Sequence, residues 1–114
     1  MHGLYAAYFA GLNGNSLGLF YIGNDVIAGV DVGGSHFDGR LTPSEDGGLE
    51  GLLEFEPGGD QKLITGVAVD AIPKKIPVKI KLPSNFATGV VIRIETPIGP
   101  LNARFEKLKD LPPL

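Results

Sequence analysis

The sequence of 114 residues contains no cysteine and no tryptophan, only one methionine and only two histidines. Because there is no cysteine, the chain forms no disulfide and offers neither a thiol nucleophile nor a thiolate ligand for zinc, a composition compatible with a reducing compartment. His2 and His36 are far apart, and neither has a second histidine at the spacing of a metal site. We therefore expect no bound metal and no cofactor.

The sequence also lacks long apolar runs and a strong excess of either charge. No run approaches the roughly 18 apolar residues of a transmembrane helix, and Met1-His2-Gly3-Leu4 lacks the basic start of a secretory signal. Ten Lys and Arg against thirteen Asp and Glu leave a net charge of −3, whereas a surface for nucleic acid or an anionic membrane needs a basic stripe. We expect a cytoplasmic protein that contacts neither nucleic acid nor membrane.

Glycine and proline are abundant instead, with 17 and 9 copies, and they interrupt the chain too often for long helices. The segments between them are rich in β-branched and aromatic residues and are typical of β-strands. Glycine and asparagine tolerate a positive φ, so Gly23-Asn24-Asp25 predicts a tight hairpin. Residues 63–72 fit either a strand or a short helix. The expected strands are residues 3–10, 17–22, 26–32, 36–41, 49–56, 78–82, 84–96 and 101–106.

The regular spacing of these strands predicts an all-β sandwich or barrel. The sequence shows no internal repeat and no linker, so we expect one domain over residues 1–109 and a short proline-rich tail over residues 110–114. The C-terminal strands alternate between apolar and charged residues, as in Val78-Lys79-Ile80-Lys81-Leu82. This alternation is typical of an antiparallel sheet with one face in solvent.

The two N-terminal strands differ, because they are apolar on both faces. In residues 3–10 and 17–22, aliphatic and aromatic residues occupy the alternate and the intervening positions alike. Only one face of a barrel strand points inward, so the second apolar face requires a cover. We expect a homodimer through these strands; the alternative is a single barrel with an apolar flank.

Aromatic residues are spread over most of the expected strands, and their ordinary place is the core. The interior of an eight-stranded barrel is either filled by side chains or just large enough for one small ligand. The sequence leaves both outcomes open. If the barrel is hollow, we expect its cavity to be lined by Tyr5, Phe9, Phe20, Phe37, Phe55 and Phe105.

Residues suited to catalysis or to partner binding are few. The serines have no histidine and acid at a recognisable spacing, and there is no nucleophile elbow, so we do not expect an enzyme. Glu45 and Asp46 form the one compact acidic spot, in the polar loop of residues 42–48. Such a spot is either a solvated turn or a contact for a basic partner.

Turn glycines and packed aromatic residues recur in a distinctive order. They are Gly3-x-Tyr5, Gly18, Ile27-x-Gly29-x-Asp31, Phe37 and Gly39, followed at the end of the chain by Asn102-Ala103-Arg104-Phe105-Glu106-Lys107-Leu108. This order resembles the GrlR-like family, whose named members are negative regulators of type III secretion in enteric pathogens. The resemblance covers residues 3–56 and, more loosely, residues 98–108.

The resemblance implies a calycin-like or lipocalin-like barrel that pairs as a homodimer. It also implies binding to a transcriptional activator rather than to DNA, through an acidic loop that corresponds here to Ser44-Glu45-Asp46-Gly47-Gly48. We therefore expect a single antiparallel barrel of roughly eight strands and a non-enzymatic, GrlR-like regulator that binds a protein partner through Glu45 and Asp46. The alternative function is a carrier or sensor of a small apolar ligand held in the barrel.

Overall fold

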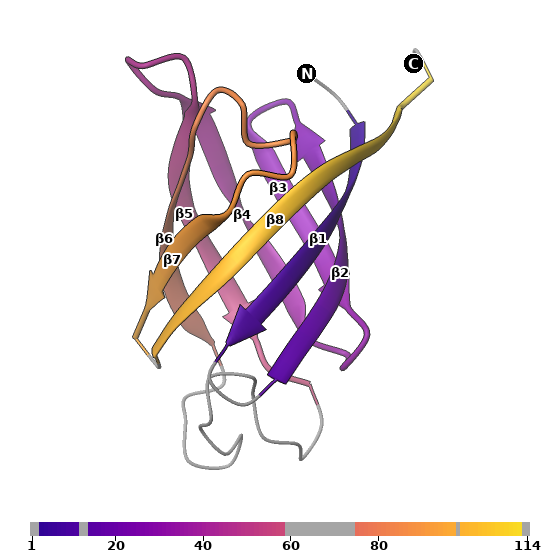
Figure 1. Cartoon of the computed structure of the whole chain (residues 1–114), viewed down its shortest axis with the longest axis vertical. Coiled ribbons are helices and arrows are strands. Elements are labelled where there is room, and N and C mark those ends of the chain that lie inside the picture. Colours follow the sequence, from indigo (N-terminus) through magenta and orange to yellow (C-terminus); the bar gives the residue numbers. More distant parts are fainter. Residues whose placement is uncertain (1–2, 12–13, 59–74, 98, 113–114) are drawn as a thin grey trace.

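Eight strands form one antiparallel sheet that curls into a nearly closed barrel (Figure 1), which confirms the predicted all-β fold. The computed structural model describes residues 3–11, 14–58, 75–97 and 99–112. In these ranges no helix is long and apolar enough to span a membrane. The strands are β1 (Gly3–Gly11), β2 (Gly14–Gly23), β3 (Val26–Asp31), β4 (His36–Pro43), β5 (Leu49–Glu56), β6 (Ile76–Leu82), β7 (Ile92–Thr96) and β8 (Gly99–Asp110).

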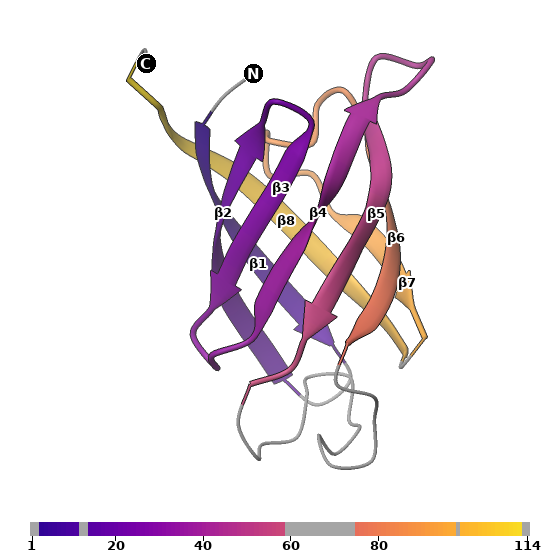
Figure 2. The same ribbon diagram turned by 180° about the vertical axis from the view of Figure 1, so that it is seen from behind.

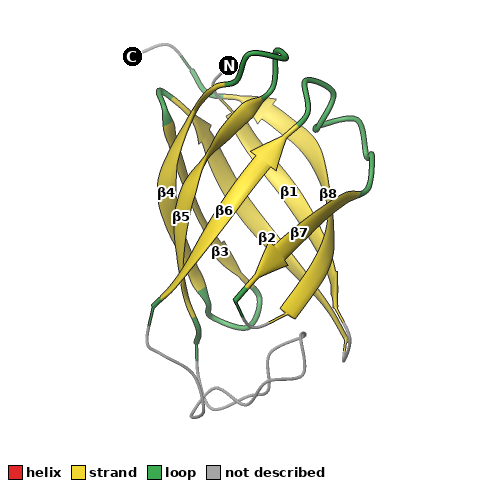
Figure 3. Ribbon diagram, turned by 90° about the vertical axis from the view of Figure 1, so that its left-hand side faces the viewer, coloured by secondary structure: helices red, strands yellow, loops and turns green. Residues whose placement is uncertain are grey.

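The strands follow one another around the barrel, and the first strand pairs with the last. Their order is β6-β5-β4-β3-β2-β1-β8-β7 (Figure 2). β1 pairs antiparallel with β8, with an irregularity between Leu4 and Tyr5 of the kind that bends and twists a strand locally. The edge strands β6 and β7 are neighbours in space (Figure 3), although no hydrogen-bonded ladder joins them within the described residues.

The hairpin between β2 and β3 has the predicted tight geometry. Gly23 pairs with Val26, which leaves a loop of two residues, and Asn24 and Asp25 have φ angles of 51° and 62°. A positive φ at both central residues belongs to the turn whose twist matches that of the flanking strands. This loop therefore fixes the register of β2 against β3.

Side chains alternate between the two faces of the sheet, and those on the inner face form the core of the barrel. β6 shows the pattern most clearly, because its alternate apolar residues are buried inside while Lys79 and Lys81 are exposed outside. Each inward face contributes to one continuous core. Its largest fully buried side chains are Tyr5, Phe20, Phe86, Phe105, Ile27, Leu41, Ile76 and Leu82.

The prediction of a strand over residues 84–96 is wrong for its first half, because β7 begins only at Ile92. Two successive turns replace that half, and the backbone hydrogen bonds that close them have nitrogen-to-oxygen distances of 3.0 and 3.1 Å. They carry the Phe86 ring into the barrel, where it lies 5.5 Å from the Tyr5 ring and 6.0 Å from the Phe105 ring. Burial of this ring outweighs the local strand propensity, and it closes one end of the barrel.

Two further predictions concern residues 63–72 and the C-terminal tail. Residues 63–72, expected as either a strand or a short helix, lie outside the described residues. β8 runs through Asp110, so the expected start of the tail falls on the last residue of that strand.

Candidate functional site

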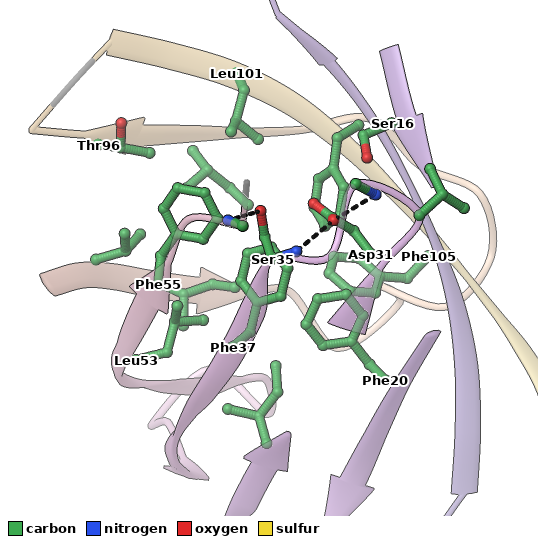
Figure 4. Close-up of a pocket in the computed structure, with 18 of the residues that line it drawn as sticks. Ser16, Phe20, Asp31, Ser35, Phe37, Leu53, Phe55, Thr96, Leu101 and Phe105 are labelled. Carbon is green, nitrogen blue, oxygen red and sulfur yellow. Dashed lines mark hydrogen bonds between the residues drawn. The ribbon is translucent and has the colours of Figure 1, made fainter. Parts of the chain in front are cut away.

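An aromatic cavity, here called the cup, lies at the end of the barrel away from Phe86, and Figure 4 shows side chains that line it. Its volume is about 210 Å³, and aliphatic side chains such as Leu53 and Leu101 complete its wall. Five of the six aromatic residues expected around a hollow interior line it: Phe9, Phe20, Phe37, Phe55 and Phe105. The open question of a filled or hollow barrel thus has two answers: side chains pack around Phe86, whereas the cup is hollow.

The phenylalanine rings form a contiguous wall. Phe37 stacks on Phe55 with ring centroids 5.0 Å apart and an angle of 23° between the planes. Phe37 also lies 5.0 Å from Phe20 and 6.0 Å from Phe9. Phe20 meets Phe105 edge to face at 6.1 Å. These rings come from five strands, so the cup exists only because the sheet curls into a barrel.

Tyr5 is the expected cavity residue that does not line the cup. It shares the inward face of β1 with Phe9, but it lies toward the other end of the strand and packs against Phe86. Its side chain is buried, with 1% of its surface exposed. This burial raises the pKa of the Tyr5 phenol. Tyr5 therefore belongs to the packed end of the barrel.

A tight turn between β3 and β4 forms part of the rim of the cup. The Asp31 carboxylate oxygen Oδ1 accepts hydrogen bonds from the backbone N–H groups of Gly33 (2.9 Å) and Ser35 (3.0 Å). Ser35 is buried, and its hydroxyl oxygen accepts a hydrogen bond from the Gly58 N–H (3.2 Å). Gly34 has a φ of 86°, which favours glycine at this point of the turn. The turn is thereby tied to the end of β5, and Asp31 is held in place.

Ser16 and Asp31, two polar residues of the rim, were not among the site residues predicted from the sequence, although their positions in the strands indicate that they face inward. Ser16 stands two residues before Gly18 and four before Phe20, so the alternation of β2 places all three on the inward face. Asp31 follows Ile27 and Gly29 on β3 in the same way. A polar residue at the end of a strand, on the same face as the inward apolar residues of that strand, therefore indicates the rim of a barrel.

The acidic loop lies at the opposite end of the barrel from the cup, between β4 and β5. Within it, the Ser44 hydroxyl donates a hydrogen bond to Asp46 Oδ1, and the Gly48 N–H donates to the same oxygen at 3.2 Å. Lys81 Nζ lies 3.5 Å from Asp46 Oδ2. The hydrogen bond from Ser44, then that from Gly48, and then the Lys81 ammonium hold the pKa of the Asp46 carboxyl below its usual value. Glu45 is exposed beside it.

The outer face of β1, β2 and the end of β3 is apolar, as expected from the sequence. Ala6, Leu19 and Val30 are direct cross-strand neighbours on these three strands. The Arg104 guanidinium lies 5.7 Å from the centre of the Tyr8 ring at one border of the face. The large apolar residues exposed there are Tyr8, Leu17, Leu19, Val30 and Val32. This set is called the outer apolar face below.

His36, the histidine considered for metal binding, is exposed on the outer side of β4. In the part of the chain that the structure describes, no three His, Asp or Glu residues gather as ligands for a metal ion. No family model matches the chain, and no match is found among curated proteins or solved structures. The resemblance to the GrlR-like family thus stays a prediction from the sequence.

Proposed function

We propose that this protein binds a small apolar ligand in the cup and acts as its carrier or sensor. The observation that carries the proposal is the cavity of about 210 Å³ walled by five phenylalanine rings. An apolar protein cavity of about 150 Å³ is large enough to take up benzene, whereas drug-sized ligands occupy about 300 Å³ or more. The cup therefore suits a ligand somewhat larger than benzene.

The proposal is tested by filling the cup. Leu101 is partly buried on the cup wall, so Leu101→Trp places an indole in the space of the ligand. Leu52→Trp introduces the same side chain on the outer side of β5, where Leu52 is 52% exposed. We expect 2-phenylethanol to shift NMR signals of cup residues in the unaltered protein and in Leu52→Trp, but not in Leu101→Trp. Equal shifts in all three proteins would contradict ligand binding in the cup.

We keep the regulatory role predicted from the sequence as a second proposal. Its support is the exposed acidic loop, which projects from the end of the barrel away from the cup, so that a protein bound there leaves the cup open (Figure 1). The cup has stronger support, because the Asp46 carboxylate is already engaged by Ser44, Gly48 and Lys81. Reversing both charges, Glu45→Lys with Asp46→Lys, should abolish capture of a basic regulatory partner; unchanged capture would contradict this proposal.

We also propose that a second copy of the chain covers the outer apolar face. Monomeric proteins rarely expose a contiguous apolar patch of this kind. A two-fold axis along β2 places the two apolar faces against each other, with Leu19 of one copy beside Leu19 of the other.

A further inference from the structure

We infer that the cup selects a ligand whose apolar body ends in a hydrogen-bond donor, either an amine or a hydroxyl, and that Asp31 and Ser16 receive this end. The inference rests on the proposed function, since it names the class of ligand for the same cavity. It excludes the fatty-acid type of ligand, which ends in a carboxylate.

Asp31 presents an unused acceptor at the cup. Oδ1 is taken by the two N–H groups of its own turn, whereas Oδ2 accepts no hydrogen bond from any residue that the structure describes. The side chain is partly buried and lies on the lining of the cup (Figure 4). Because the turn is also tied through Ser35 to Gly58, the carboxylate is held in position before a ligand arrives.

Ser16 stands beside Asp31 at the rim. Gly18 pairs with Asp31 across β2 and β3, and Ser16 is the next inward residue along β2. Ser16 also pairs with Phe9, the first ring of the wall. Figure 4 shows the Ser16 hydroxyl and the Asp31 carboxylate on the same side of the cup. A ligand that stacks on the phenylalanine rings thus has both groups within its reach at one end.

The charge of the cup decides which end group fits. Asp31 is the one ionisable side chain among the described residues of the lining; the other polar groups there are neutral. An amine gains a charge-assisted hydrogen bond to the carboxylate and a favourable contact with the faces of the rings. A carboxylate ligand meets like charge at a partly desolvated site, where no described cation offsets the repulsion.

The experiment uses three probes of nearly equal size: 2-phenylethylamine, 2-phenylethanol and phenylacetate, titrated at pH 7 and constant ionic strength and followed by NMR. We expect the amine to bind most tightly and phenylacetate most weakly, with the amine at least about tenfold tighter than phenylacetate, as one hydrogen bond to a charged group allows. This ranking in the unaltered protein requires no variant and so does not depend on the folding of one.

The variant Asp31→Asn removes the charge but keeps an oxygen that can accept the turn hydrogen bonds at the position of Oδ1. It should lower the affinity for the amine about tenfold, to the level of the alcohol. The matched control, Asp38→Asn, makes the same change of net charge on the outer side of β4, where Asp38 is exposed, and should leave all three affinities unchanged.

The outcomes separate this inference from the function on which it rests. If none of the three probes binds, the proposed ligand site itself is wrong. If all three bind with equal affinity, or if Asp31→Asn leaves the preference for the amine intact, the cup binds ligands but Asp31 does not select them. Tightest binding of phenylacetate would also overturn the inference, because it requires a cation at the rim.

Discussion

The ring of Phe20 lies directly over Gly29 on the neighbouring strand. The two residues pair across β2 and β3, and a Cβ atom added to Gly29 would stand only 2.5 Å from Cδ2 of the ring and 2.7 Å from its Cγ. Glycine is thus required at residue 29 because the ring occupies the space of a side chain, an arrangement by which an aromatic residue covers a glycine in a sheet. The missing side chain sets the position of Phe20 in the wall of the cup.

Substitution of Gly29 is expected to displace Phe20. Gly29→Ala should lower the free energy of unfolding by about 1–3 kcal/mol, the usual cost of overpacking a core, and should weaken binding of 2-phenylethanol. Urea unfolding and NMR titration measure the two effects. The double variant Gly29→Ala with Phe20→Leu should be more stable than the sum of the single variants predicts, because the smaller side chain relieves the contact. Additive effects would show that the two side chains do not compete for this space.

Phe86 is expected to be essential for the closed end of the barrel. It is 1% exposed and contacts the rings of Tyr5 and Phe105, so Phe86→Ala leaves a cavity and should lower the free energy of unfolding by about 3–5 kcal/mol. Val91→Ala, in the same segment but with Val91 61% exposed, should change it little. Urea unfolding measures both variants, and a loss below about 1 kcal/mol for Phe86→Ala would contradict the packing described here.

The hydrogen bonds to Asp46 predict a dependence of stability on pH. Because the pKa of this carboxyl is lower in the folded chain, its stabilising contribution is present above the pKa of an unfolded aspartate, about 3.9, and is lost as the pH falls through the folded value. Asp46→Asn should therefore be less stable than the unaltered protein at pH 6, and the difference should shrink below about pH 4. Urea unfolding across this range measures it.

A control in the same loop separates these hydrogen bonds from net charge. Glu45→Gln also removes one negative charge, but it leaves the bonds from Ser44 and Gly48 to Asp46 in place. If the two variants lose stability equally and with the same pH dependence, charge and not hydrogen bonding governs the effect.

A charge on the outer apolar face is expected to separate the proposed dimer. Leu19 is 46% exposed at the centre of the face, and Leu19→Lys would bring two like charges together across the two-fold axis. Light scattering over a dilution series should give twice the chain mass of 12.0 kDa for the unaltered protein and the single mass for this variant. Leu52→Lys on β5 is the control. A mass of 12.0 kDa for the unaltered protein at every concentration would overturn the dimer.

Much of the candidate site could be anticipated from alternation along the strands. The inward positions of Phe9, Phe20, Phe37, Phe55 and Phe105 follow from a period of two residues, and these five residues line the cup. Tyr5 satisfies the same period and yet lies outside the cup, because alternation fixes the face of a residue and not its height in the barrel. Its position along the barrel axis places Tyr5 beside Phe86 and away from the cup.

The sequence by itself determined the strands, their faces and the tight turns, since these depend on neighbours a few residues apart: Asn24 and Asp25 set a hairpin, and alternation in β6 sets its buried side. Only the tertiary structure decided that β1 pairs with β8, that the segment before Ile92 turns inward, and that Ser16 and Asp31 both line the open rim of the cup. These relationships join residues distant in the chain. They arise because burial of large rings and closure of the sheet outweigh local propensity.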